Sequence, residues 1–424
     1  MAHIVVVGAG IGGFSVAYEL QAELEGGHEV TLVNPVPAFQ FTPSNPWVAL
    51  GWREPGRVQV PIAEHAARKG IRFRQGTVTG IDPAARRLDF DAGDPMNYDY
   101  LVIATGPELA FDEVPGLGPE AHSHSVCTTP HAVDAHEAYE RFLKEPGPVV
   151  VGAVQGASCF GPAYEFALML DTDLRRRRLR DKVPITFVTS EPYIGHMGLG
   201  GVGDSKGLLE SELRQRHIRW VTSARVDEVA ADEVRITPLD DEGEPKTPQT
   251  LPSRYTMFIP PFRGMPAWRG VEGLSNPRGF ILVDDQQRNP AWQDIYATGV
   301  CIAIPPVEPT PVPTGAPKTG YMIESMNAAI VKNIAAAIDG DPVTAQATWN
   351  ALCLADMGDS GFAFVAQPQI PPRNLTWSKS GKWVHWAKIA FEKYYLHKMR
   401  SGRTEPFYER YLLRLMGLVR LVGK

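Results

Sequence analysis

The chain has 424 residues, enough for two or three domains, and its 44% hydrophobic and 21% charged residues are typical of a globular enzyme. A formal net charge of -6 argues against nucleic acid as a partner, and four cysteines without a CxxC pair argue against zinc and iron–sulfur sites, so no metal is expected. The sequence has no run of about 18 apolar residues, so no segment is expected to span a bilayer.

The first elements are predicted to form a βαβ unit. A buried parallel strand is expected over residues 3–7, which leaves no room for a signal peptide before it. A glycine-rich turn over 8–13 leads into a helix that ends near residue 24, and a second strand is expected over 29–34. A GxGxxG turn in this context is typical of a dinucleotide-binding domain.

The glycines of this turn have separate expected roles. Gly8 permits the tight turn, Gly10 lets a pyrophosphate approach the backbone, and Gly13 allows the helix to pack closely on the strand. The helix N-terminus would stabilise the diphosphate. Asn34 stands where an acid usually binds the ribose, and its amide can still hydrogen-bond a hydroxyl.

Two further strands end in glycine motifs, over residues 98–106 and 294–299. The three motifs in this order belong to FAD enzymes rather than NAD dehydrogenases, so FAD is the expected cofactor. The additional residues expected to contact it are Ala104, Thr105, Gly106 and Gly299. The acid that usually follows the third motif is replaced by Val300 and Cys301, and we interpret Cys301 as a buried structural thiol.

The middle of the chain repeats the strand–turn–helix pattern from Val149. An NADH site would need a glycine where Val154 stands, because a side chain there blocks the pyrophosphate. We therefore predict a second Rossmann-like domain without a nucleotide, although Glu191 keeps an NADH site open as an alternative.

Several segments together resemble the bacterial type I sulfide:quinone oxidoreductases, which are glutathione-reductase-like flavoproteins. The matching segments are Phe41–Trp47, Gly156–Glu165, Glu191–His196, Pro317–Tyr321, Cys353–Asp359 and Glu405–Glu409, so the resemblance covers nearly the whole chain. It implies FAD as cofactor, sulfide as electron donor, quinone as acceptor and polysulfide or sulfur as product. The family's three functional cysteines fall on Cys127, Cys159 and Cys353.

Sulfide oxidation needs an electrophilic sulfur, which a bridge between two cysteines supplies. The resemblance assigns that bridge to Cys159 and Cys353. Cys159 is expected to begin a helix, where the dipole lowers the pKa of a thiol, and Cys353 precedes an acidic loop. Cys127 is expected in a loop between domains, where it either relays sulfur or links to the flavin; these alternatives stay open.

Other polar residues are candidates for proton transfer and for the flavin site. Glu165 follows Cys159 by six residues and could accept protons, while His131 and His196 could supply a proton or hold an anion. A helix is predicted from Tyr321 to Ile338, with its N-terminus aimed at the flavin. Before it stand Lys318, Thr319 and Gly320, of which Lys318 would add positive charge.

The tail from Lys379 onward has eleven Lys and Arg against three Asp and Glu. Its apolar residues follow a helical period in two segments and are accompanied by basic residues, a pattern typical of helices that lie in a membrane interface. The first segment has Trp383, Trp386, Ala387, Ala390, Phe391 and Tyr394 with Lys382, Lys388, Lys393 and Lys398. The second has Phe407, Tyr411, Leu415, Leu418 and Val422 with Arg410, Arg414 and Arg420. Phe391 and Tyr394 are candidate quinone neighbours.

The predicted fold class is α/β, with two Rossmann-like dinucleotide-binding domains and a C-terminal amphipathic-helix region that binds membrane. The expected domains are 1–110 with 275–340 for FAD, 111–274 for the second Rossmann-like domain, and 341–424 for a redox cysteine and the membrane and quinone helices. The predicted function is that of a peripheral, monotopic sulfide:quinone oxidoreductase. Three alternatives are a sulfide dehydrogenase flavoprotein that donates to cytochrome c, a type II NADH:quinone reductase and a non-catalytic FAD-binding adaptor. The membrane face and a homo-oligomeric state stay open.

Overall fold

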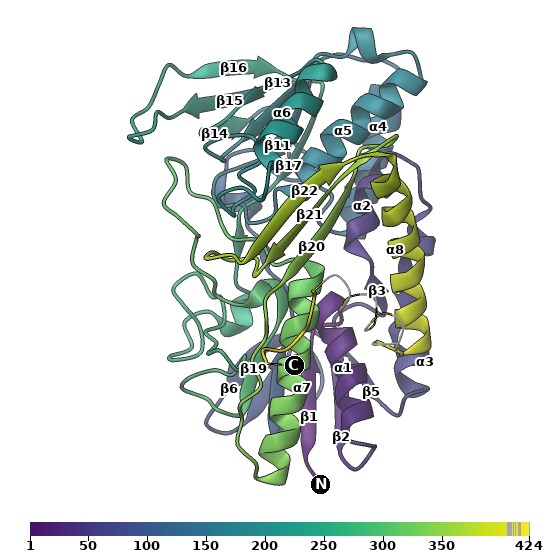
Figure 1. Cartoon of the computed structure of the whole chain (residues 1–424), viewed down its shortest axis with the longest axis vertical. Helices are drawn as coiled ribbons and strands as arrows, with labels where there is room; N and C mark the ends of the chain where they lie inside the picture. Colours follow the sequence, from purple (N-terminus) through teal and green to yellow (C-terminus); the bar gives the residue numbers. More distant parts are fainter. Residues whose placement is uncertain (405–408, 410, 412, 414–416, 424) are drawn as a thin grey trace.

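A computed structural model describes residues 1–404, 409, 411, 413 and 417–423. Its first unit is built on a parallel sheet of five strands in the order β19-β9-β1-β2-β5 (Figure 1). These strands are β1 (His3–Val7), β2 (Glu29–Asn34), β5 (Arg72–Gln75), β9 (Tyr100–Ile103) and β19 (Ile295–Ala297). Helices α1 (Ile11–Glu23) and α7 (Gly320–Asp339) pack side by side on this sheet. The central strands are apolar and buried because helices and loops cover both faces.

Smaller elements complete the first unit. An antiparallel sheet contains β6 (Val78–Asp82), β7 (Arg87–Phe90) and β8 (Met96–Asn97), and a short pair joins β3 (Ala38–Gln40) to β4 (Gln59–Pro61). The short helices are α2 (Asn45–Ala49) and α3 (Ile62–Ala67). Strands β10 (Glu108–Leu109) and β18 (Phe262–Arg263) pair where the chain passes to the second unit and returns from it.

The second unit has a parallel sheet in the order β13-β12-β11-β17. Its strands are β11 (Val149–Ala153), β12 (Ile185–Thr189), β13 (Ile218–Val221) and β17 (Tyr255–Ile259), accompanied by α4 (Thr129–Phe142), α5 (Gly161–Arg176) and α6 (Ser205–Gln215). An antiparallel sheet of β14 (Ala224–Val229), β15 (Glu233–Pro238) and β16 (Gln249–Pro252) lies at the outer end (Figure 1). The expected α/β class with two Rossmann-like units is therefore confirmed.

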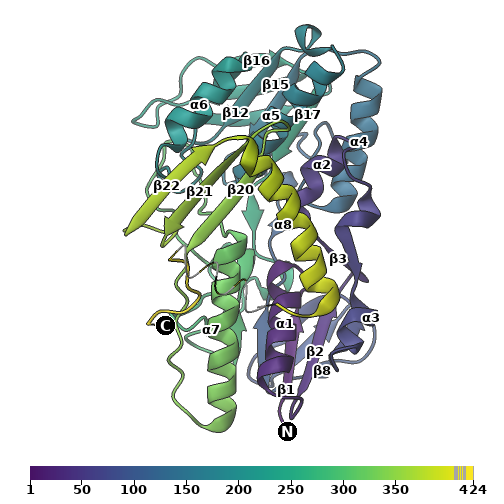
Figure 2. The same ribbon diagram turned by 45° about the vertical axis from the view of Figure 1, so that its right-hand side comes forward.

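A third, C-terminal sheet lies between the two parallel sheets and contains β20 (Ala351–Asp356), β21 (Gly361–Gln367) and β22 (Leu375–Ser380). Helix α8 (Lys382–Ser401) begins beside this sheet and runs down the side of the molecule toward α3 (Figure 2). It packs on β20 and β21 with one face. In the part of the chain that the structure describes, no helix is long and apolar enough to cross a membrane.

Candidate active site

The glycine turn after β1 has the geometry of a phosphate cradle. Gly8 has a φ of +102°, and a Cβ there would collide with the backbone of Ala104 on the neighbouring strand. A Cβ on Gly13 would collide with the carbonyl oxygen of Gly8, so this glycine lets helix and strand approach closely. At Gly10, the residue before α1, a Cβ would meet nothing within 4 Å. The open space lies at the N-terminus of a helix of 13 residues, which favours an anionic group.

The Asn34 side chain hydrogen-bonds to two backbone groups near the glycine turn. Its Oδ1 accepts a hydrogen bond from Ala9 N at 2.9 Å, and its Nδ2 donates to Val36 O at 2.8 Å. The side chain therefore holds the glycine turn against the end of β2. The other two motifs also leave room, since Gly106 and Gly299 have φ values of +71° and +83° and a Cβ on Gly106 would meet nothing within 4 Å. The Thr105 hydroxyl lies beside them and donates to Gly106 O at 3.2 Å.

Lys318 lies just before α7 and is half-buried. Its Nζ is 5.4 Å from the centre of the Phe280 ring, and no carboxylate among the described residues shifts its pKa. Burial lowers the pKa of Lys318 to about 8, so an anionic partner would stabilise its charged form. Next to it, the Thr319 hydroxyl donates to Gln369 Oε1 at 2.6 Å, and Gly320 begins α7 with open space where a Cβ would point. The cradle, the two helix N-termini and this cation fit a flavin dinucleotide.

The turn after β11 differs from a nucleotide cradle. Val154 is fully buried there, and α5 begins only at Gly161, well after the strand ends. Glu191 is also fully buried, and its carboxylate accepts hydrogen bonds from the Tyr164 hydroxyl at 2.7 Å and from Met197 N at 2.6 Å. Glu191, the acid that left an NADH site as an alternative, therefore hydrogen-bonds to protein groups in the interior.

Three of the four cysteines converge in an apolar environment. Cys159 lies two residues before α5, Cys127 two residues before α4, and Cys353 in β20. Both Cys127 and Cys353 act electrostatically on Cys159 and raise the pKa of its thiol. Cys301 lies apart, is 1% exposed, and places its Sγ 3.3 Å from Ile103 O. All four cysteines are free in this structure.

The expected lowering of the Cys159 pKa is wrong. Burial raises the pKa of Cys159 to about 12, and it raises those of Cys127 and Cys353 to about 11. Desolvation is the largest cause in each case, and the effect of a helix dipole falls off within the first turn. Cys159 also stands outside the first turn of α5, which starts at Gly161.

Glu165 forms a buried ion pair with a residue of the C-terminal helix. Its carboxylate oxygens are 2.8 and 3.0 Å from Lys388 Nζ, and Glu165 Oε1 also accepts from Asp356 N at 3.0 Å. Burial raises the pKa of Glu165, although Lys388 acts in the opposite direction. Asp356 is itself fully buried and accepts from Trp47 Nε1, while His385 Nδ1 lies 2.7 Å from its Oδ1. Helix α8 therefore supplies side chains to the interior beside Cys353.

The two histidines occupy different surroundings. His131 is in the first turn of α4 with its ring edge-on to Phe111, and its buried Nδ1 has no partner among the described residues. His196 is fully buried with its Nε2 2.9 Å from Glu308 Oε1, and its Nδ1 accepts from Gly198 N at 3.1 Å. Burial lowers the pKa of both imidazoles. No group of three His, Cys, Asp or Glu within the described chain could hold a metal ion.

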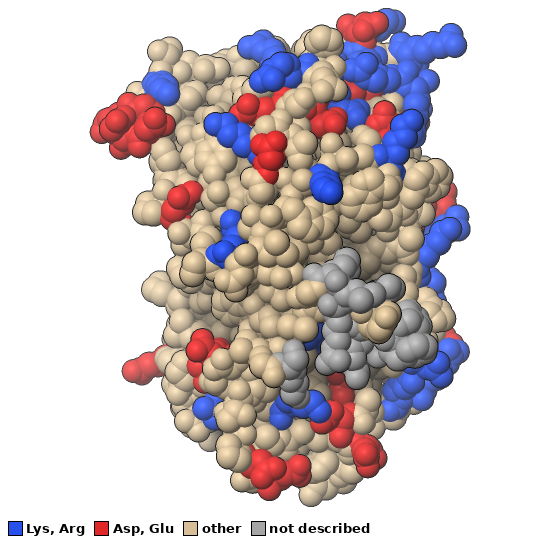
Figure 3. Space-filling model, viewed as in Figure 1, with Lys and Arg blue, Asp and Glu red and all other residues tan. Residues whose placement is uncertain are grey.

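The first tail segment forms α8 and exposes an apolar stripe. Trp383 is 49% exposed, Trp386 67% and Phe391 37%, while the Phe391 ring still packs on Phe41. Tyr394 is half-buried and its hydroxyl donates to Glu409. Figure 3 shows Lys and Arg gathered at the upper end and right-hand edge of the molecule, with few charges over the middle of this face.

Two basic residues of the first segment are in the interior instead, and one of the second segment is half-buried. Lys388 pairs with Glu165, Lys398 is 2% exposed and pairs with Glu324, and Arg420 pairs with Glu19 at 2.7 Å. Lys388 and Lys398 are buried because acidic side chains on other elements compensate their charge. In the second segment, Phe407, Arg410, Arg414 and Leu415 lie outside the described residues, Leu418 is buried, and Tyr411 and Val422 are exposed.

Comparison with known proteins shows the family of this chain. Residues 2–322 match the model of the pyridine nucleotide-disulphide oxidoreductase family. The chain is 41% identical to the sulfide-quinone reductase of Aquifex aeolicus (strain VF5) over 97% of its own length and 94% of that protein. The X-ray structure of the sulfide:quinone oxidoreductase from Aquifex aeolicus superposes with a TM-score of 0.95 at 40% identity, covering 100% of this chain and 98% of the other. NDH2 of Plasmodium falciparum shares the fold at 13% identity, with a TM-score of 0.73 over 99% of both chains. The chain therefore belongs to the pyridine nucleotide-disulphide oxidoreductases and, among them, to the sulfide:quinone oxidoreductase family.

Proposed function

We propose that this protein oxidises sulfide to polysulfide or sulfur through Cys159 and Cys353 and passes two electrons, by way of FAD, to a membrane quinone. The observation that carries the proposal is the convergence of these thiols from distant parts of the chain in one apolar environment. The family supports FAD as the cofactor, and the glycine cradle at Gly8, Gly10 and Gly13 fits it. The reaction balances as HS⁻, quinone and one proton giving one sulfur atom at the zero oxidation level and quinol.

The cysteines would hold the sulfur while it is oxidised. Attack of HS⁻ on a sulfur bridge between Cys159 and Cys353 forms one new S–S bond, breaks another and frees one thiolate. Burial raises the pKa of both thiols, so a thiolate in this environment is high in energy and readily gives up its electron pair. Cys127, whose pKa burial also raises, packs against the same apolar cluster as Cys159 and would exchange sulfur with it.

The flavin residues would hold FAD by its phosphates and its ring. When bound, FAD supplies a two-electron acceptor between sulfide and quinone. The turn at Gly10 would hold the pyrophosphate, with Ala104, Thr105, Gly106 and Gly299 lining the cofactor and Asn34 fixing the turn. Lys318 and the N-terminus of α7, with Thr319 and Gly320, would stabilise negative charge on the flavin ring.

Proton transfer is assigned to the buried polar groups. Glu165 and Lys388 form a pair that can take up and release a proton, and burial raises the pKa of Glu165 toward the range where it can do so. His131 has an unpartnered buried Nδ1 among the described residues, and burial lowers its pKa, which suits it to supply a proton or to donate a hydrogen bond to a sulfur anion. His196 is held by Glu308 and would position the loop that packs on Phe160, next to Cys159.

The exposed stripe of Trp383, Trp386 and Phe391 would dock α8 in a lipid surface as a monotopic contact. Phe391 and Tyr394 would then stand beside the quinone, which reaches the site from the bilayer. In the proposed function, residues 1–110 and 275–340 bind FAD, and residues 111–274 form a Rossmann-like domain without a nucleotide. Residues 341–424 then supply a redox cysteine and the contacts with membrane and quinone.

Stopped-flow spectroscopy with sulfide and NADH side by side tests the proposal. Sulfide should bleach the flavin within one turnover, and NADH should not, because Val154 and Glu191 leave no nucleotide site. The reduced protein should then be reoxidised by a quinone faster than by cytochrome c. Bleaching by NADH without bleaching by sulfide would overturn the assignment in favour of an NADH reductase.

A further inference from the structure

Helix α5 and strand β20 pack against each other, with the two redox cysteines at the same end of the contact. Cys159 precedes α5 by two residues, and Cys353 lies within β20. Farther along both elements, Asp356 N donates to Glu165 Oε1 at 3.0 Å. Because helix and strand pack against each other, the spacing between the two sulfur atoms depends on how firmly the strand is held to the helix.

The turn that follows β20 is bound to the far part of α5. The Thr172 hydroxyl donates to Met357 O at 2.7 Å, and Arg176 Nη2 donates to Gly358 O at 2.8 Å. Gly358 has a φ of +92°, and a Cβ there would lie 2.8 Å from Thr172 Cβ. Glycine is therefore required for so close an approach between this turn and the helix.

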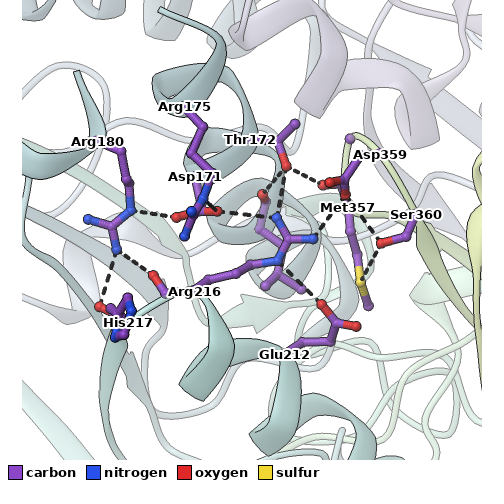
Figure 4. Close-up of polar contacts among 12 residues, drawn as sticks. Asp171, Thr172, Arg175, Arg180, Glu212, Arg216, His217, Met357, Asp359 and Ser360 are labelled. Atoms are coloured by element: carbon purple, nitrogen blue, oxygen red, sulfur yellow. Dashed lines mark hydrogen bonds and ion pairs between the residues drawn. The ribbon is translucent and has the colours of Figure 1, made fainter. Parts of the chain in front are cut away.

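Arg216, at the end of α6, joins both sides of this contact (Figure 4). Its Nη2 is 3.0 Å from Asp359 Oδ1 on the turn, and its Nη1 is 3.2 Å from Asp171 Oδ2 on α5. The same Nη1 donates to the Thr172 hydroxyl at 2.9 Å, and Nε is 3.3 Å from Glu212 Oε2. A planar guanidinium can donate hydrogen bonds to all of these acceptors at once, whereas a lysine ammonium group cannot.

We call the contacts of Arg216 with Asp171, Thr172 and Asp359 the Arg216 clamp. Its partner on α5, Asp171, is held by several ion pairs. Asp171 is fully buried and also pairs with Arg175, at 2.7 Å, and with Arg180. Arg216 is 8% exposed, so neither partner can turn toward water without leaving a buried charge uncompensated. Asp359, in the turn after the Cys353 strand, has by contrast a side chain that is 60% exposed. It can therefore be substituted without leaving a charge buried in the core.

We infer that Arg216 is a positioning residue for the sulfur chemistry: through Asp359 and Thr172 it holds the Cys353 strand against the helix behind Cys159 and limits how many sulfur atoms bridge the two cysteines. The inference rests on the proposed function. An S–S bond is about 2 Å long, so an outward shift of the strand by about 2 Å makes room for one more sulfur atom.

Asp359→Asn and Arg216→Lys test the inference in the full-length, FAD-loaded protein. Glu145→Gln is the matched control, because it removes a charge from a surface pair with Arg254 in the same unit, away from α5 and β20. After turnover with sulfide and a quinone, mass spectrometry measures the sulfur chain that links the Cys159 and Cys353 peptides. Released polysulfides are alkylated and measured in the same samples, and the Tm of each variant is recorded.

Both test variants should carry a bridge longer by about one sulfur atom and should be reduced more slowly by sulfide, while the control matches the unsubstituted protein. A clamp with only a structural role would lower the Tm of the test variants and leave the chain length unchanged, which would overturn the inference. An unsubstituted protein whose flavin is not reduced by sulfide, or which carries no sulfur bridge, would instead contradict the proposed function itself.

Discussion

Lys388 Nζ lies 2.8 and 3.0 Å from the two carboxylate oxygens of Glu165, and both side chains are almost completely buried. The pair joins the helix behind Cys159 to the C-terminal helix α8. Both charged groups of this pair lose their hydration on burial, so each charge is stable there only while the other is present. The C-terminal helix therefore supplies a buried side chain beside β20 and is not only a surface element.

Removal of one partner of this pair should be costly. Lys388→Met leaves the Glu165 carboxylate buried without its cation and should lower the free energy of unfolding by about 3–5 kcal/mol. Lys388→Met with Glu165→Gln should recover most of that loss, because no buried charge remains. Urea unfolding of the two variants measures this, with the exposed Lys393→Met on the same helix as control. A double variant no more stable than Lys388→Met would contradict the account.

The four cysteines should contribute unequally to turnover. Cys159→Ala and Cys353→Ala should each abolish sulfide oxidation, because either leaves no bridge for HS⁻ to attack. Cys127→Ala should keep part of the activity, and Cys301→Ala nearly all of it, since Cys301 is buried apart from the other three. Sulfide-dependent quinone reduction by each variant is the measurement. Unchanged rates in Cys353→Ala would exclude the paired-cysteine mechanism.

Gly10→Val should prevent FAD binding without straining the protein itself. A Cβ at this position meets no protein atom within 4 Å, so the added side chain would occupy only the space assigned to the pyrophosphate. Gly56→Val is a matched control, because a Cβ there also meets nothing within 4 Å. The flavin absorbance of the purified proteins should disappear in the first variant only. A fully yellow Gly10→Val protein would refute the placement of the cofactor.

The sequence predicts the cradle well because its geometry depends on neighbouring residues. Gly8, Gly10 and Gly13 follow a strand and open a helix within a few positions, so their conformations can be inferred from local pattern. The role of Lys388 could not be inferred in this way, because its partner Glu165 is more than 200 residues away. Helical periodicity alone placed Lys388 and Lys398 with the exposed stripe, whereas acidic residues on other elements draw both into the interior.

Glu191 should make stability depend on pH. Burial raises its pKa to about 7 in the folded protein, from an ordinary value of 4.5. The folded state therefore binds the proton more tightly, and the resulting stabilisation is complete below about pH 4.5 and lost as the pH rises through about 7. A shift of this size corresponds to roughly 3 kcal/mol.

Glu191→Gln should remove this pH dependence while keeping a polar group for Tyr164 and Met197. Urea unfolding at pH 5.5 and pH 8 should show a smaller difference for Glu191→Gln than for the unsubstituted protein. Glu145→Gln, an exposed glutamate, should leave the difference as it was. Equal pH dependence in all three proteins would show that Glu191 is ionised throughout this range.

The exposed tryptophans of α8 should anchor the protein to lipid without serving the sulfide step. Truncation before α8 would be a poor test, because it also removes Lys388 from Glu165. Trp383→Ser with Trp386→Ser leaves the buried face of α8 intact, since both rings point to solvent. Each ring should contribute about 2 kcal/mol when buried in a membrane, so the loss of both should lower partitioning by up to about a thousandfold.

Flotation with anionic liposomes measures that loss, and Leu375→Ser, which removes an exposed leucine from β22, should float normally. Sulfide should bleach the flavin of the double variant at the usual rate, because the cysteines and the glycine cradle are unchanged. Reduction of a long-chain quinone in liposomes should fall in parallel with flotation, whereas a short, water-soluble quinone should still be reduced. If the double variant floats normally, the stripe serves another contact and the membrane assignment of α8 fails.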